Sequence, residues 1–130
     1  MKKGPLPARC CSLFSKELGI KYLDIARDRA LLKLSFKKEL TNPHGGLHGG
    51  AIASLADTAA ALSLSKRFDN CNFFTVSLKI RFKAQAKADI FALASVTSSR
   101  KNLYLIGVKI FDSKKTEVAQ CHATFYVQKV

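Results

Sequence analysis

Acidic residues are scarce in this chain of 130 residues, which has nine aspartates and glutamates against 22 lysines and arginines. The resulting formal net charge of +13 raises the attraction to any polyanion. The basic residues are nevertheless scattered, with neither a recognition-helix pattern nor the basic and aromatic interleaving of single-strand binders. We therefore expect no nucleic-acid partner and interpret most of the charge as a solvated surface.

The sequence also lacks an apolar run long enough to span a bilayer. Two lysines and two prolines lie in the first seven residues, and no long apolar stretch follows them, unlike in a signal peptide. We expect a soluble, cytoplasmic protein with no membrane partner. By its length and 48% hydrophobic composition the chain forms one core, with residues 1–19 as a tail and short helix and 20–130 as the single folded domain.

Paired metal-ligand spacing is absent as well. The four cysteines lie too irregularly to close a zinc site and are expected to be reduced thiols: Cys10, Cys11, Cys71 and Cys121. His44 and His48 would share a helix face, but Pro43 and two glycines argue against a helix there. The sequence therefore predicts neither a metal site nor a cofactor.

Glycine and histidine, which are rare overall, are concentrated in one segment. Residues 42–57 hold four of the seven glycines and two of the three histidines. From Leu47 to Ser65 the only formally charged side chain is Asp57. An ionised carboxylate in apolar surroundings costs on the order of several kcal/mol unless it is paired, hydrogen-bonded or functional. Asp57 is therefore the first candidate for a functional residue.

The pattern before this segment predicts a short helix and an extended stretch. Residues 10–19 are helix-like, with Ser12 as a possible N-cap and Gly19 as the stop. Residues 22–36 alternate with period two around a polar bend, which is typical of strands, and residues 41–47 form a loop.

The pattern after it predicts a long helix followed by strands. Residues 49–66 are rich in alanine and leucine and apolar almost all round, so this helix must be wrapped by other elements, and Asp69 and Asn70 supply the turn after it. Four strands follow, near residues 74–83, 89–99, 103–112 and 117–128. In the first, Phe74, Val76 and the alternate residues to Phe82 should face the core. Short turns predict an antiparallel meander. The fold class is therefore α+β, a curved sheet of about five or six strands wrapped around one long central helix.

One combination of residues is similar to a known family. The order strand, Asn42-x-x-Gly45-x-x-His48-Gly49-Gly50, buried helix with Asp57, then four strands resembles the hotdog-fold acyl-CoA thioesterases of the PaaI-like (phenylacetate-degradation) branch. The resemblance covers about residues 20–128, and the spacing from His-Gly-Gly to the aspartate is its most specific part. It implies hydrolysis of an acyl-CoA to a free acid and coenzyme A by a homodimer or homotetramer.

The resemblance also implies roles for individual residues. Asp57 would be the nucleophile or the general base, Asn42 would hydrogen-bond the thioester or the water, and His48 would position the loop or the leaving sulfur. Thr75 would help to hold the water. The substrate-binding residues would be Gly50 and three cations that suit the coenzyme A phosphates: Lys79, Arg81 and Arg100.

Two of these roles have a physical basis of their own. Glycines at a helix start let a ligand approach closely, and the Gly49 N–H could stabilise the oxyanion of a thioester under attack. His48 and Asp57 are nine residues apart, about 14 Å of helical rise and half a rotation, so they face apart within one chain. A site using both requires two subunits related by a two-fold axis, which is also how the family builds its sites.

Simpler interpretations remain open at this point. Asp57 could be a structural carboxylate, His48 could only pack the loop, and His122 is expected to be an ordinary sheet residue. The three cations could be solvated surface. An alternative function is a non-catalytic acyl-CoA or acyl-carrier binder on the same fold. The segment 82–87 has neither the proline nor the glycine usual in the family, which leaves the shape of the substrate tunnel open.

Overall fold

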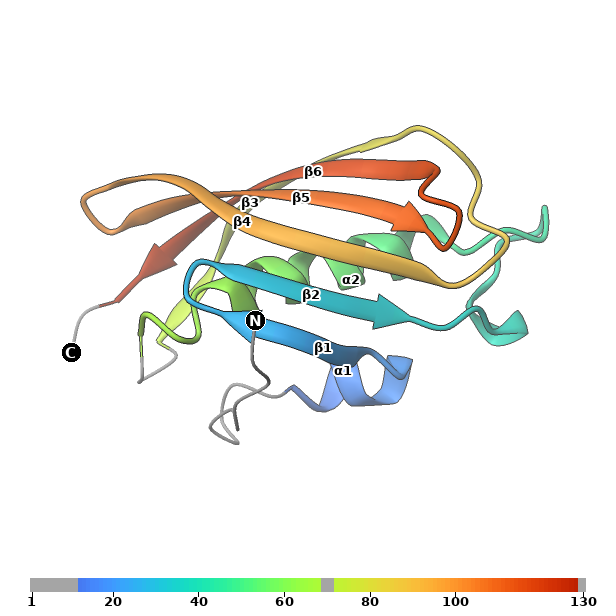
Figure 1. Ribbon diagram of the computed structural model, residues 1–130, viewed down its shortest axis with the longest axis horizontal. Coiled ribbons are helices and arrows are strands. Elements are labelled where there is room, and N and C mark those ends of the chain that lie inside the picture. The colour runs from blue at the N-terminus through green and yellow to red at the C-terminus, as the bar shows by residue number, and fades with distance from the viewer. Residues whose placement is uncertain (1–11, 69–71, 129–130) are drawn as a thin grey trace.

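The computed structural model describes residues 12–68 and 72–128. The elements run in the order α1 (Leu13–Leu18), β1 (Lys21–Ala26), β2 (Arg29–Leu34), a 3-10 turn η2 (Lys38–Leu40), α2 (Gly49–Ser63), β3 (Phe73–Phe82), β4 (Ile90–Arg100), β5 (Leu103–Asp112) and β6 (Glu117–Val127). The six strands form one antiparallel sheet in the order β1-β2-β4-β5-β6-β3. The sheet curves over α2 and leaves its outer face uncovered (Figure 1). The expected α+β fold, with one long helix against a curved sheet, is confirmed.

The short N-terminal helix forms where the caps predicted it. The Ser12 side chain accepts the N–H of Ser15, and Gly19 ends the helix in the left-handed conformation at φ 80°. The Ser15 hydroxyl shares a hydrogen bond of 3.2 Å with Thr58, which attaches α1 to α2. The predicted turn at Asp69 and Asn70, like Cys10, Cys11 and Cys71, lies outside the described residues.

The long helix α2 packs its apolar faces against the sheet. The fully buried members include Leu55, Ala56, Ala59 and Ala60. Ala53, Ser54, Asp57 and Thr58 stay half-buried, so the chain alone does not wrap the helix on all sides as its composition predicted. The uncovered side carries Asp57.

The strand after α2 differs from the prediction in two respects. β3 pairs with β6 at the edge of the sheet, so only β4, β5 and β6 form a meander. The connection 83–89 carries the chain across the end of the sheet, where the Ala86 carbonyl accepts the Leu47 N–H at 2.8 Å. The short length of the segment between β3 and β4 does not predict this crossover. The path of the segment depends on the hydrogen bond to the loop before α2.

A bulge in β3 also makes the predicted facing of this strand wrong. The register shifts between Thr75, opposite Phe125, and Ser77, opposite Thr124, which leaves Val76 without a partner. Opposed residues share a face, so Thr75 lies on the inner face with buried Phe125. Phe74, Val76 and Phe82, all predicted to face the core, are 53%, 57% and 53% exposed. Beyond the bulge, Leu78 and Ile80 oppose buried residues of β6, as predicted.

Truncation of the core at α2 gives a stability prediction. Leu55→Ala should lower the free energy of unfolding by about 2–5 kcal/mol, because the side chain is fully buried and its removal leaves a cavity. Leu105→Ala is the matched control, since Leu105 is 43% exposed, and should cost below about 1 kcal/mol. Urea unfolding of both variants measures the difference, and equal losses would contradict the assigned core.

Candidate active site

Asp57 is bonded to a residue of the edge strand. The Thr75 hydroxyl donates a hydrogen bond of 2.6 Å to Asp57 Oδ1, across from α2 to β3. The bulge at Val76 makes this contact possible, because without it Thr75 would face away from the helix. The hydroxyl hydrogen of Thr75 is used in the bond to the carboxylate. The hydroxyl oxygen can still accept a hydrogen bond from water. The structure therefore brings together two of the predicted site residues.

The thiol of Cys121 lies on the same inner face of the sheet. Cys121 is buried on β6 opposite Ile80, and no disulfide involves it. Burial, followed by the negative charge of Asp57, raises the pKa of the Cys121 thiol to about 11. This thiol therefore stays protonated at neutral pH and is a poor nucleophile, so Asp57 is the stronger candidate of the two.

His48 is the N-cap of α2. Its Nδ1 accepts the Gly50 N–H at 2.8 Å, so in the neutral ring the Nε2 carries the proton and can donate it. A Cβ added at Gly50 would lie 3.0 Å from His48 Nδ1, which explains why glycine suits this position. Since the Gly50 N–H is occupied by His48, it is not available to a ligand.

The Gly49 N–H, in contrast, is unused. No described residue accepts a hydrogen bond from it, although it is the first N–H of α2 and points out of the positive end of the helix dipole. Gly49 and Asn42 line the same cleft of about 330 Å³, together with Leu47, Ile52, Phe82 and residues 84–86. A carbonyl oxygen in this cleft could reach a free backbone donor.

Asn42 mainly organises the loop before α2. Its Oδ1 accepts the N–H groups of His44 at 2.9 Å and Gly46 at 3.3 Å, and its own N–H donates to the Gly46 carbonyl at 2.7 Å. The amide nitrogen of the side chain has no acceptor among the described residues. Asn42 therefore offers one donor to the cleft that it shares with Gly49.

The predicted residues do not form one site within a single chain. Asp57 and Thr75 line neither the Asn42–Gly49 cleft nor the neighbouring cleft of about 410 Å³ beside His48 and Gly50. This separation agrees with the helical spacing of His48 and Asp57. The described residues also contain no cluster of three side chains suited to a metal ion.

The predicted phosphate-binding cations lie elsewhere. Lys79 opposes His122 and Arg81 opposes Gln120, which places both on the outer face of the sheet, away from Asp57. Arg100 ends β4 at the β4–β5 hairpin. Within one chain, the sheet therefore separates Lys79 and Arg81 from the candidate catalytic pair.

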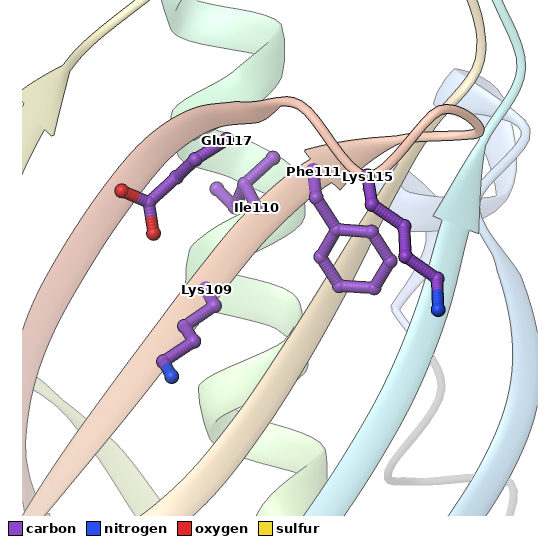
Figure 2. A pocket seen from close by; sticks show the side chains of 5 residues that line it. All are labelled: Lys109, Ile110, Phe111, Lys115 and Glu117. Carbon is purple, nitrogen blue, oxygen red and sulfur yellow. The ribbon is translucent and has the colours of Figure 1, made fainter.

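Two hollows on the outer face hold none of the predicted site residues. One of about 280 Å³ lies at the turn between β5 and β6, where Figure 2 shows the side chains that line it: Lys109, Ile110, Phe111, Lys115 and Glu117. A larger one of about 440 Å³ lies beside it around Gly107 and includes Lys109 and His122. Sequence reasoning missed the larger hollow, because the only local signal is a glycine inside a strand.

Comparisons with known proteins support the fold. Residues 12–127 match the family described as "Domain of unknown function (DUF4442)". A Halobacterium salinarum protein named "Putative esterase VNG_1336C" is 27% identical over 85% of this chain and 81% of its own length. A Bacillus subtilis protein named "Putative esterase ComA2" is 24% identical over 86% of this chain and 91% of its own length.

Solved structures with the same architecture include two relevant neighbours. The PaaI protein of the E. coli phenylacetic acid degradation operon superposes with a TM-score of 0.81 at 23% identity, covering 91% of this chain and 86% of that one. A mutant of the Staphylococcus aureus thioesterase SAV0944 superposes with a TM-score of 0.85 at 18% sequence identity. The match covers 91% of this chain and 100% of that one. At these identities the likeness shows the fold alone. The predicted hotdog fold of the PaaI-like type is confirmed.

Proposed function

We propose that this chain, which belongs to the DUF4442 family of domains of unknown function, hydrolyses acyl-CoA thioesters in a site shared between two subunits. The observation that carries the proposal is the hydrogen bond from Thr75 on β3 to Asp57 on α2, since the first N–H of the same helix, at Gly49, is free. The esterase names of the relatives and the thioesterase among the fold neighbours support the same class of reaction.

The chemistry follows from these groups. The thioester oxygen lies at the Gly49 N–H, where charge that develops during attack is stabilised by about 3 kcal/mol. Asp57 of the other subunit either attacks the carbonyl carbon or removes a proton from an attacking water held by Thr75. The C–S bond then breaks, and the leaving coenzyme A thiolate can accept a hydrogen bond from His48 Nε2–H. The thiolate takes its proton from solvent or from the Asp57 carboxyl group that has accepted one from water. If Asp57 attacked the carbonyl carbon, water then hydrolyses the anhydride between its carboxyl group and the acyl group. By either route the product is a free acid.

The edge strand provides the surface for the second subunit. β3 has β6 on one side only, and Phe74, Val76 and Phe82 are each more than half exposed. An exposed apolar edge is a template for pairing with another strand. Pairing of β3 with β3 of a second copy would extend the sheet and bring the two α2 helices close to each other, which supports a homodimer as the smallest active unit.

A panel of acyl-CoAs tests the activity. Release of the coenzyme A thiol, followed with a thiol-reactive chromogen, should exceed the uncatalysed rate for at least one member of an aromatic, short-chain and long-chain set. A rate no higher than the uncatalysed rate for every acyl-CoA of the panel would contradict the proposal. In the chain's described residues, no helix is both long and apolar enough to cross a membrane.

Mixing of two inactive variants tests the shared site. A random mixture of Asp57→Asn and Gly49→Pro chains should recover about one quarter of wild-type activity, because half of the dimers are mixed and each mixed dimer has one intact site of two. The mixture is unfolded and refolded together, and the separately refolded variants serve as the control. No recovery would place both groups in one subunit's site.

A further inference from the structure

The outer face of the sheet carries a cationic groove that the proposed hydrolysis does not use. The groove of about 440 Å³ lies across β2, β4, β5 and β6, on the face opposite to α2 and Asp57. Its volume lies within the range of small-molecule sites, about 300–1,000 Å³. A ligand bound there would be separated from Asp57 by the sheet itself.

The strand register explains how the groove arises. One row of residues crosses four neighbouring strands, because each member pairs with the next: Arg29 on β2, Ser95 on β4, Gly107 on β5 and His122 on β6. Lys79, which pairs with His122, continues the row on β3. Gly107 contributes no side chain at the centre of this row, which leaves a hollow above its backbone. A Cβ at Gly107 would meet Thr97 Cγ2 at 3.6 Å, an ordinary contact, so a side chain could fill the hollow without a clash.

The groove has an unbalanced positive charge. Arg29 and Lys109 are exposed, and neither forms an ion pair with a described carboxylate. Asp28, next to Arg29 in the chain, uses both oxygens for Arg67, at 2.9 and 2.6 Å. Glu117, which lines the neighbouring hollow, is bonded to Lys83. Asp28 and Glu117 are therefore occupied, and neither neutralises the groove cations, which can bind an external anion.

The remaining groove residues favour an organic phosphate over a bare ion. Ser95, Thr97 and Gln120 offer hydroxyl and amide groups, while Leu93 adds an apolar side chain and Gly107 adds backbone that no side chain of its own covers. Arginine and lysine suit phosphate through charge-assisted hydrogen bonds. Peptide groups without a side chain above them allow a planar ring to lie against the strand. Phosphate, hydroxyl groups and a planar ring occur together in nucleotides.

We propose that the groove around Gly107 binds a phosphorylated nucleoside, with the phosphate at Arg29 and Lys109 and the ring over Gly107. Two sources share this chemistry, namely a free mononucleotide and the phosphorylated adenosine portion of a coenzyme A molecule that is not held at Asp57. The smaller hollow beside Phe111 (Figure 2) shares the lining residue Lys109 with the groove and would offer space to a longer ligand.

Calorimetric titration of the full chain at near-physiological salt tests this site. The probes are adenosine 5′-monophosphate, adenosine 3′,5′-bisphosphate, coenzyme A, adenosine and inorganic phosphate. At least one phosphorylated nucleoside should bind at least about tenfold more tightly than adenosine, because a charge-assisted contact is lost without the phosphate. Binding of adenosine 5′-monophosphate would identify a free nucleotide as the ligand. Binding of only the bisphosphate and coenzyme A would identify the adenosine portion of the coenzyme.

Three variants locate the binding. Arg29→Gln should weaken it at least about tenfold, and Gly107→Leu should abolish it by filling the groove without changing the charge. Arg27→Gln is the matched control, since Arg27 is exposed in the turn two residues before Arg29 and does not line the groove. It should leave the affinity unchanged. Circular dichroism checks that each variant folds. If Gly107→Leu does not fold, the comparison of Arg29→Gln with Arg27→Gln tests the location of the site.

Other results would overturn the proposal. These are no binding of any phosphorylated nucleoside, equal loss in Arg27→Gln and Arg29→Gln, or tighter binding of DNA or RNA that Gly107→Leu leaves intact. The last two would indicate a general polyanion attraction, with strong salt dependence. Acyl-CoA hydrolysis by the wild-type chain is measured separately, so failure at the groove does not affect the proposed reaction.

Discussion

Replacement of Asp57 by asparagine is expected to lower the rate of thioester hydrolysis at least about a hundredfold. Asparagine has nearly the same shape and can still accept the Thr75 hydrogen bond of 2.6 Å, so the contact between α2 and β3 is kept. It removes the negative charge that is needed to attack the carbonyl carbon or to take a proton from water. The measurement is thiol release from the best acyl-CoA of the panel.

Thr75→Val provides the matched comparison for Asp57→Asn. Valine keeps the branched shape but loses the hydroxyl. The Asp57 carboxyl group itself is retained, so a smaller loss of rate is expected. Thermal unfolding of both variants shows whether the fold is intact. If Asp57→Asn turns over substrate as fast as wild type while it still binds acyl-CoA, the chain is a non-catalytic binder and the carboxylate only orders the pocket.

Replacement of Gly49 by proline is expected to lower the rate by about a hundredfold to a thousandfold, since it deletes the free N–H that would stabilise the oxyanion. The fold should tolerate this change. Proline is favoured at the first position of a helix, and the preceding His48, at φ −61° and ψ 138°, already has the extended conformation required before proline. The loss should appear in kcat more than in KM.

Gly49→Ala separates the missing N–H from the added bulk. Alanine keeps the donor, and its Cβ would lie 3.5 Å from the Phe82 ring, which is an ordinary contact. Most of the activity should therefore remain. Equal losses in Gly49→Ala and Gly49→Pro would mean that the position needs space and that its N–H contributes nothing to the reaction.

The elements that local physics determines could be predicted from the sequence. Ser12 and Gly19 act on their own turns, so the ends of α1 follow from residue type. The alanine-rich run predicts α2 from Gly49, although the helix ends at Ser63 and not near Lys66. The strands after it alternate clearly, and β5 has the predicted limits, Leu103–Asp112.

Features that depend on pairing between distant segments could not be predicted. The place of β3 beside β6 depends on the path of residues 83–89, and its bulge depends on the register with β6. For the same reason, alternation alone assigns Thr75 to the polar face of the strand, whereas the structure places it against Asp57. The groove at Gly107 requires four strands in register, which no single segment encodes.

The unpaired Val76 affects how this strand is aligned with those of other proteins. A gapless comparison with a regular strand would match Thr75 to a neighbour that points outward, and would assign its role to the wrong position. One inserted residue restores the correspondence on both sides. Searches for relatives with the same hydroxyl partner should therefore allow a single-residue gap at this point of the chain.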